Sequence, residues 1–216
     1  EDACDFPAAR RALDQLGGIS VTVVKEKSEI PEHHRNSTTL FIETVRGAPV
    51  RHCPGSKGHL CCNYITVDVY LGCTLGCSYC IMKDYLNFSP ITVYVDTAPA
   101  LQALHSIAGM NTDRMVRVGT GEVGDSLLLD PLFDLSKEFI EEVSGYSNLY
   151  FELKTKTGFI DHLLDIPRKG NTVIGFSLNP ESIIAKEEGA SASLSERLEA
   201  ADKAVRNGFL LERKST

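Results

Sequence analysis

From residue 64 onward, short apolar runs typical of β-strands alternate with amphipathic runs typical of α-helices. The strand-like runs lie at 64–70, 91–95, 113–119, 148–155 and 171–178. Helical spacing occurs at 98–109, 131–146 and 193–208, and a short helix is expected near 158–165. This alternation predicts parallel βα units of an α/β protein, in a barrel or an open sheet. A further strand begins after Gly208 and the sequence ends within it, so a barrel would be left truncated at its C-terminus. Either the sequence is a fragment or its last element is atypical.

The first 59 residues follow a less regular pattern. Residues 7–16 have helical spacing, and residues 19–24 and 39–45 are expected to be strands. Residues 46–62 are rich in glycine, proline and cysteine and are expected to be irregular. We therefore expect an N-terminal extension over residues 1–59 and the incomplete barrel core over residues 60–216.

Composition and charge narrow the class of protein. Of the 216 residues, 43% are hydrophobic and 24% are charged, which is ordinary for a soluble globular protein. No apolar run approaches the ~20 residues that span a bilayer, and the N-terminus does not resemble a secretory signal, so we expect a cytoplasmic protein without a membrane partner. The net charge of −7 argues against a surface coated for nucleic acid, although it does not exclude a local basic groove.

Three cysteines lie within eight residues in the stretch "LGCTLGCSYC" at 71–80, directly after a predicted strand. The CxxxCxxC spacing of Cys73, Cys77 and Cys80 suits three corners of a cuboidal iron–sulfur cluster, because each thiolate must reach a different iron. Three ligands for four irons leave one iron open to another molecule. Two alternatives remain: a zinc site completed by His59 or Cys62, and three buried thiols without a ligand.

The other cysteines carry weaker signals. Cys53, Cys61 and Cys62 are better explained as core thiols than as a second metal site, because adjacent residues of an extended chain point in opposite directions. Cys4 is expected to be incidental. The odd total of seven cysteines argues against a disulfide framework.

The cysteine motif and several other segments together resemble a known family. "CTLGCSYC" is similar to the signature of the radical SAM superfamily. The segments "CPGSKGHLCCNY", "GTGEVGDSLLLD", "FELKTKTGFIDHLLD", "GFSLNPESI" and "GASASLSERLEAA" resemble the spore photoproduct lyase family, in the same order, over roughly residues 50–209.

The resemblance implies a partial (β/α) barrel of the radical SAM type, with the site at the C-terminal ends of the strands. It also implies two cofactors, a 4Fe–4S cluster and S-adenosylmethionine (AdoMet). The cluster would cleave AdoMet reductively to a 5′-deoxyadenosyl radical, which abstracts hydrogen from a substrate. The implied partners are an electron donor of the flavodoxin or ferredoxin type and a substrate. The substrate is unknown, and nucleic acid is one candidate.

By resemblance, five residues are expected to line the AdoMet pocket. Tyr79 lies where the superfamily places an aromatic near the adenine, although simple packing explains it equally well. Gly121 and Glu122 form a glycine-rich turn that ends in an acid, which would approach the amino group of AdoMet. The alternative is an ordinary turn with a solvated Glu122.

The remaining two expected pocket residues lie at later strand ends. Lys156 matches a family lysine that contacts the AdoMet carboxylate, and Lys154 is its competitor because the end of the strand is uncertain by about two residues. Ser177 would donate a hydroxyl, and Asn179 is an alternative to it. A small polar residue that fills a strand end explains Ser177 as well.

One residue departs from the family pattern. Spore photoproduct lyases that act on DNA carry a cysteine immediately before the turn equivalent to "TGE", and it returns a hydrogen atom to the thymine. This chain has Gly119 there, which cannot act as a thiol donor. The departure and the acidic charge favour a radical reaction on another substrate over complete repair of a DNA thymine photoproduct. A non-enzymatic metal-binding or electron-transfer protein is the alternative of another class.

Overall fold

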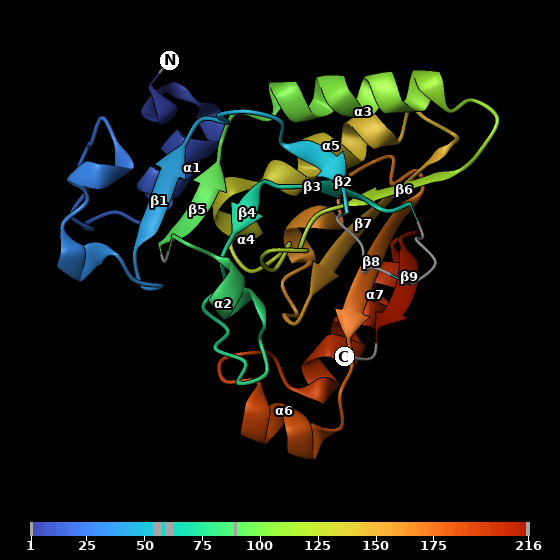
Figure 1. Cartoon of the computed structure of the whole chain (residues 1–216). Coiled ribbons are helices and arrows are strands. Elements are labelled where there is room, and N and C mark those ends of the chain that lie inside the picture. Colours follow the sequence, from blue (N-terminus) through green and yellow to red (C-terminus); the bar gives the residue numbers. More distant parts are fainter. Residues whose placement is uncertain (1, 54–57, 59–62, 89, 215–216) are drawn as a thin grey trace.

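A mostly parallel sheet of six strands forms the centre of the molecule (Figure 1). The computed structural model describes residues 2–53, 58, 63–88 and 90–214. The strand order is β2-β3-β6-β7-β8-β9, in which β3 and β6 to β9 are parallel and β2 is antiparallel to β3. The strands span Val50–His52, Ile65–Val67, Val116–Gly119, Leu149–Thr155, Thr172–Ser177 and Leu210–Lys214. This open sheet of βα units confirms the fold class expected from the alternating pattern.

A second sheet has three strands and contains the strand that precedes the cysteines. Its order is β1-β5-β4, formed by Leu40–Glu43, Ile91–Tyr94 and Tyr70–Leu71. The expected single strand over 64–70 is therefore two short strands, because the chain leaves the main sheet after β3 and pairs with β5 through β4. Asp68, at the change of sheet, forms an ion pair with Arg51 of β2. The cysteine segment begins directly after β4.

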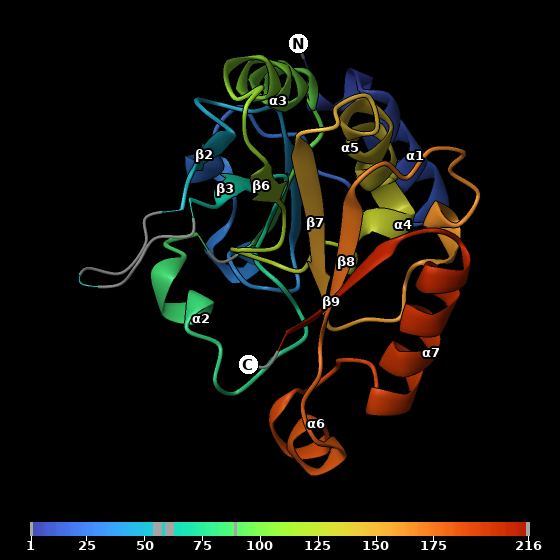
Figure 2. The ribbon, with the colours of Figure 1, turned by 90° about the vertical axis from the view of Figure 1, so that its right-hand side faces the viewer.

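Helices cover the main sheet (Figure 2). In chain order α1 to α7 span Pro7–Gln15, Met82–Tyr85, Ala98–Met110, Asp130–Phe133, Leu135–Val143, Glu181–Glu187 and Leu194–Arg206. Single 3₁₀ turns lie at Ala3–Asp5, Lys27–Glu29, Glu32–His34 and Asp161–Leu163. Helix α5 packs on β7, and α7 packs on β8 and β9. Ser193 and Glu196 form a capping box at the start of α7.

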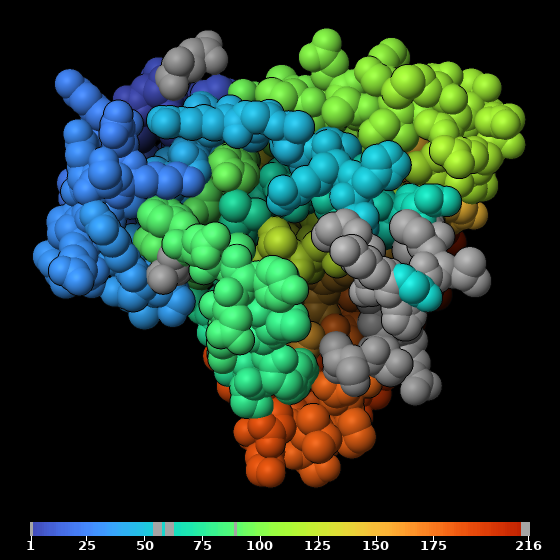
Figure 3. Space-filling view, in the orientation of Figure 1, coloured from blue at the N-terminus to red at the C-terminus, as the bar shows by residue number. Residues whose placement is uncertain are grey.

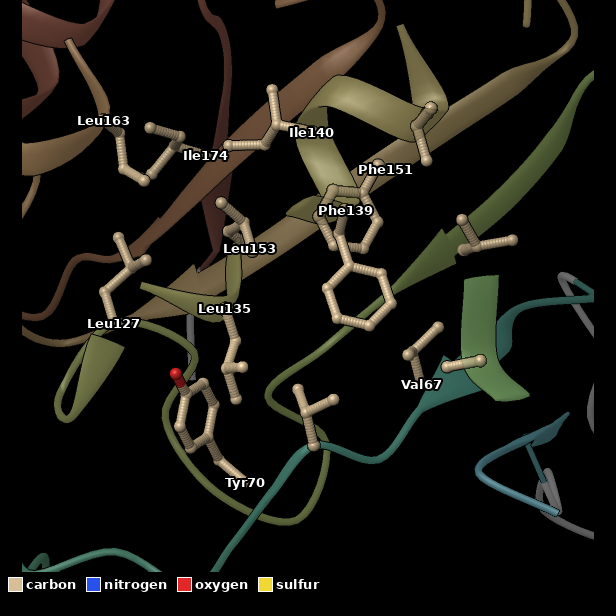
Figure 4. Packing of buried hydrophobic residues seen from close by; sticks show 14 of the residues in the cluster. Val67, Tyr70, Leu127, Leu135, Phe139, Ile140, Phe151, Leu153, Leu163 and Ile174 are labelled. Atoms are coloured by element: carbon tan, nitrogen blue, oxygen red, sulfur yellow. The ribbon is translucent and has the colours of Figure 1, made fainter. Parts of the chain in front are cut away.

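Strand alternation divides β7 between two environments. Phe151 and Leu153 are fully buried in the core, where the ring of Phe151 stacks on Phe139 of α5 at 5.7 Å between centroids (Figure 4). Glu152 and Lys154 lie on the opposite face of the strand, since successive side chains alternate. The hydrophobic core therefore fixes one face of the sheet and leaves the other face to polar groups.

Three further expectations about elements need correction. Residues 19–24 are not a strand: the segment has no strand partner among the described residues, and Ile19, Val21 and Val23 are exposed. The helix expected over 131–146 is two helices, because Asp134 adopts a left-handed conformation with φ of 60°. The helix expected near 158–165 is a single 3₁₀ turn. The expectations did not include β2, α2 or α6.

The N-terminal residues join the same core as the sheet. Ala8, Ala9 and Ala12 of α1 belong to the hydrophobic cluster, and β1 pairs in parallel with β5. A domain boundary between residues 59 and 60 stays a prediction. Within the described ranges, no helix combines the length and apolar character that crossing a membrane requires.

Candidate cofactor site

The expected site residues follow the C-terminal ends of neighbouring strands. The cysteine segment follows β4, residues 120–122 follow β6, Lys156 follows β7, and Ser177 ends β8. Strands β6, β7 and β8 are parallel neighbours, so their carboxyl ends lie at one edge of the sheet. We call this edge, with the cysteine segment beside it, the strand-end rim.

The three motif cysteines lie in one loop, residues 72–81, which we call the cysteine loop. Cys77 is buried, whereas Cys73 and Cys80 are partly exposed. Burial raises the pKa of the Cys73 thiol to about 12, and the nearby Asp125, Cys77 and Cys80 add to this rise. Burial also raises the pKa of Cys77, while the Lys156 ammonium opposes the rise. The three thiols therefore lie close enough to influence one another, and Lys156 lies close to one of them.

The cysteine loop supplies thiols without arranging them around a single ion. In the part of the chain that the structure describes, no three His, Cys, Asp or Glu side chains form a group that could hold a metal ion. A cuboidal cluster makes a different demand, because each of its irons takes its own thiolate. Soft thiolates as the only donors of the motif fit an iron–sulfur cluster. The zinc alternative rests on His59 or Cys62, which, like Cys61, lie outside the described residues.

Tyr79, Lys156, Ser177 and Asn179 come together at the rim from three separate segments. The Lys156 Nζ lies 3.4 Å from the Ser177 Oγ and 5.8 Å from the centre of the Tyr79 ring. The Asn179 Nδ2 donates to the Tyr79 hydroxyl at 3.3 Å. Ser177 is buried, and Tyr79 is 44% exposed. The structure thus brings together three of the five expected pocket residues, with Asn179 beside them.

Gly121 and Glu122 lie elsewhere on the rim. Glu122 forms an ion pair with Lys154, whose Nζ also lies 4.0 Å from the centre of the Tyr64 ring. Gly121 has a φ of 85°, and a Cβ there would lie 2.6 Å from the Ser126 Oγ. Glycine is therefore required at 121 by the protein's own packing. Of the two competing lysines, Lys154 pairs with Glu122, and Lys156 joins Tyr79 and Ser177.

The space beside Gly119 is filled. A Cβ at this position would overlap the Tyr64 hydroxyl and the backbone oxygen of Glu152, and would lie 2.8 Å from the Glu152 Cβ. Tyr64 is 5% exposed, and burial together with the Glu152 carboxylate raises the pKa of its phenol. Position 119 thus has neither a side chain of its own nor room for one.

Sequence reasoning missed the buried Asp125, which holds the rim in place through hydrogen bonds to its backbone and side chains. Its carboxylate accepts hydrogen bonds from the backbone N–H of Lys156 at 2.7 Å and from the hydroxyl of Thr155 at 2.8 Å. It also accepts from the N–H groups of Leu127 and Leu128, both at 3.0 Å. These bonds fix the backbone where β7 ends. The acid follows a glycine-rich turn, and this pattern alone does not distinguish it from a solvated residue.

Sequence reasoning also missed a buried ion pair between Glu188 and Arg197. Both side chains have no exposed surface. Arg197 also donates to the Ser177 backbone oxygen at 2.7 Å, and Glu188 accepts hydrogen bonds from the Tyr79 hydroxyl and from Asn179. Charged residues on a surface helix and its preceding loop are usually solvated, so no sequence signal marked this pair.

Comparisons with known proteins agree with this geometry. The family model for spore photoproduct lyase matches residues 49–212. Spore photoproduct lyase of Bacillus subtilis (strain 168) is 30% identical over 97% of this chain and 63% of its own length. The lyase of Geobacillus sp. (strain Y412MC61) is 28% identical over 67% of this chain and 43% of its own length.

Solved structures show the same fold. A spore photoproduct lyase complexed with dinucleoside spore photoproduct has a TM-score of 0.80 at 22% identity, over 98% of this chain and 64% of that chain. A mutant lyase with bound AdoMet and dinucleoside spore photoproduct has a TM-score of 0.81 over the same shares. This chain spans somewhat less than two thirds of the length of these relatives. On the family match and the sequence identity, the chain belongs to the spore photoproduct lyase family.

Proposed function

We propose that this protein is a radical SAM enzyme of the lyase type, which holds a 4Fe–4S cluster at Cys73, Cys77 and Cys80 and binds AdoMet at the strand-end rim. When bound, these cofactors supply reductive cleavage of AdoMet and abstraction of hydrogen from a substrate. The observation that carries the proposal is the position of the cysteine loop, whose Tyr79 ring lies near the Lys156 ammonium, which in turn contacts Ser177. The family membership and the AdoMet in a related mutant structure support it.

The residues around Lys156 have chemistry that suits the polar end of AdoMet. An ammonium on a partly buried lysine is the natural partner of a carboxylate, and the Ser177 hydroxyl adds a donor. The Tyr79 ring offers an aromatic face for the adenine. Glu122 already forms an ion pair with Lys154, so it could accept a hydrogen bond from the AdoMet amino group only by sharing or giving up this pair. The pocket roles of Gly121 and Glu122 stay predictions.

For the substrate we propose a nucleic-acid lesion of the thymine photoproduct class, with an outcome that differs from complete repair. Solved structures of related lyases include complexes with dinucleoside spore photoproduct. In this chain the position of the thiol donor is Gly119, and the buried Tyr64 hydroxyl occupies the adjoining space. We therefore expect hydrogen abstraction without clean recovery of thymine. A radical reaction on another substrate is the second candidate, favoured by the same residue.

Two further predictions accompany the proposal. The reaction needs a one-electron donor, for which a flavodoxin or ferredoxin type is expected. A cytoplasmic location is expected, since the chemistry requires a reducing environment for the thiolates.

The decisive experiment is anaerobic reconstitution of the full chain with iron and sulfide. We expect broad visible absorption and, after reduction with added AdoMet, release of 5′-deoxyadenosine. Replacement of Cys73, Cys77 or Cys80 by Ala should abolish the absorption, and Cys4→Ala should not. A colourless zinc protein would contradict the enzyme proposal, and loss of the cluster in Cys61→Ala or Cys62→Ala would contradict the ligand assignment.

The same preparation tests the substrate. With a dinucleotide photoproduct, reductant and AdoMet, we expect 5′-deoxyadenosine to form while little intact thymine is recovered. Clean repair over multiple turnovers would overturn the expectation drawn from Gly119.

A further inference from the structure

The connection between α6 and α7, residues 188–193, lies against the cysteine loop although the two segments are more than 100 residues apart in sequence. Figure 3 shows the region of α2 and the cysteine loop, in green, in contact with the orange surface around α6. The Ser78 N–H donates to the Glu187 backbone oxygen at 2.8 Å, and the Ala190 N–H donates to the Leu75 backbone oxygen at 2.8 Å. The cysteine loop is therefore bonded through its backbone to the last residue of α6 and to the connection itself.

Gly189 brings the two backbones into close approach. A Cβ at this position would overlap the Leu75 backbone oxygen and lie 3.3 Å from the Gly76 carbonyl carbon. Its φ of 51° also lies in the left-handed region. The connection therefore packs on the cysteine loop without an intervening side chain.

The same connection reaches the lysine of the candidate pocket. The Ala192 N–H donates to the Lys156 backbone oxygen at 3.0 Å. The Arg197 guanidinium donates to the backbone oxygens of Ser177 and Ala192, at 2.7 and 2.9 Å. The connection thus contacts the cysteine loop and the residue that follows β7, and Arg197 of α7 links it to the end of β8.

The Glu188 carboxylate is the charged centre of this arrangement. One of its oxygens accepts from the Tyr79 hydroxyl and from the Asn179 Nδ2, the latter at 2.7 Å. The other accepts from Arg197 and, at 3.2 Å, from the Ser191 hydroxyl. A buried carboxylate with this many donors has little freedom to move, so the oxygen that Tyr79 contacts is fixed in space.

We propose that Glu188, held by Arg197, is a positioning residue for the AdoMet pocket. It fixes the Tyr79 hydroxyl and thereby holds the Tyr79 ring beside the Lys156 ammonium while the connection holds the cysteine loop. This inference rests on the proposed function, since it assigns Glu188 a part in AdoMet binding. Glu188 acts through Tyr79 and does not itself contact the cofactor.

The test is a double-mutant cycle in the full chain. Tyr79→Phe removes only the hydroxyl, and Tyr85→Phe, in the neighbouring α2 and 68% exposed, is the matched control. In reconstituted protein, Tyr79→Phe should keep the iron content and weaken AdoMet binding about tenfold, the size expected for a hydrogen bond to a charged group. Tyr85→Phe should change neither.

The second variant is Glu188→Gln, which keeps an acceptor oxygen and removes the charge. We expect AdoMet binding to weaken about threefold, because a neutral acceptor holds the hydroxyl less strongly. The double variant Tyr79→Phe/Glu188→Gln should bind AdoMet no more weakly than Tyr79→Phe alone, because both changes act on one contact. Additive losses, or full affinity in Tyr79→Phe, would overturn the proposal.

A measurement without cofactors separates this inference from the proposed function. In the apo chain, Tyr79→Phe should speed amide hydrogen exchange in residues 75–80, with the exchange of β6 to β8 unchanged, because the tie is local. Equal exchange in the wild type and Tyr79→Phe would overturn the positioning role even if AdoMet binds. Faster exchange in a chain that assembles no cluster would support the tie and contradict the proposed function. If Glu188→Gln does not fold, Tyr79→Phe, Tyr85→Phe and the exchange data still decide.

Discussion

The two halves of the strand-end rim are built differently. Beside β6, Glu122 pairs with Lys154, and the Tyr64 hydroxyl fills the space next to Gly119. Beside β8, Lys156 lies at 3.4 Å from the neutral Ser177 hydroxyl and near the half-exposed Tyr79 ring. We call these the closed half and the open half.

The difference shows which half suits a ligand. In the closed half, opposite charges neutralise one another and side chains occupy the available space, so the contacts mainly stabilise the fold. In the open half, a cation contacts neutral groups, so a ligand carboxylate would add an interaction there without displacing a protein carboxylate. Variants in the closed half should therefore change stability, and variants in the open half should change AdoMet binding.

The largest expected effect is on the closed half. Gly119→Cys should lower the free energy of unfolding by about 3 kcal/mol, because its Cβ would overlap Tyr64 and the Glu152 backbone. Chemical denaturation measures this. The double variant Tyr64→Phe/Gly119→Cys should recover only part of the loss, since the backbone overlap remains.

A cysteine at 119 would supply the thiol that this position lacks. In this backbone the thiol requires a shift of β7 as well as the substitution. A Gly119→Cys protein as stable as the wild type would show that the closed half adapts, and the donor substitution would then test repair directly.

The next effect separates the two lysines. Lys156→Ala should weaken AdoMet binding by about 2 kcal/mol, the size of a charge-assisted contact, and leave the cluster intact. Lys154→Ala should leave AdoMet binding nearly unchanged and lower stability by about 1 kcal/mol, because its pair with Glu122 is partly exposed. Titration of AdoMet into each reconstituted variant measures the first effect. If Lys154→Ala weakened AdoMet binding and Lys156→Ala did not, the closed half would be the one that binds the ligand.

A smaller effect concerns acid stability. Burial alone would raise the pKa of Glu188, but hydrogen bonds from Tyr79, Arg197 and Asn179 outweigh it and hold the pKa below its ordinary value of 4.5. As the pH falls below 4.5, the unfolded chain binds this proton first, so stability decreases through that interval. Tyr79→Phe removes one of these bonds, and the folded pKa should rise.

The measurement is urea unfolding of the wild type and Tyr79→Phe from neutral pH into the acid range. At neutral pH the wild type should be the more stable of the two, and the difference should shrink as the pH falls below 4.5. A difference that stays constant with pH would contradict the coupling between Tyr79 and Glu188.

The smallest expected effect is a control away from both halves. Gly109 lies inside α3, and no atom lies within 4 Å of a Cβ built there. Gly109→Ala should raise the free energy of unfolding by about 0.5–1 kcal/mol through helix propensity, without a change in AdoMet binding. If Gly109→Ala also lowered the free energy of unfolding, the loss of stability in Gly119→Cys could not be assigned to packing at the rim alone.

The order of the elements and the place of the cysteines follow from local features of the sequence. Strand and helix periodicity depend on local burial, so β6, β7 and β8 lie where the alternating pattern predicts them. The capping box at Ser193 is equally local, since both of its residues lie within one turn. The cysteine motif needs only its own spacing and the strand before it.

The division of roles at the rim depends on contacts between residues that lie far apart in the sequence. Lys154 lies near the end of β7 and Lys156 directly follows the strand, so their positions in the sequence do not distinguish them. Their neighbours do: Tyr64 and Glu122 surround Lys154, and Tyr79 and Ser177 surround Lys156. Residues 19–24 have a strand-like sequence but no strand partner among the described residues. Glu188 and Arg197 are charged residues whose burial depends on the cysteine loop and β8, which lie far away in the sequence. Long-range contacts decide such features, and periodicity carries no information about them.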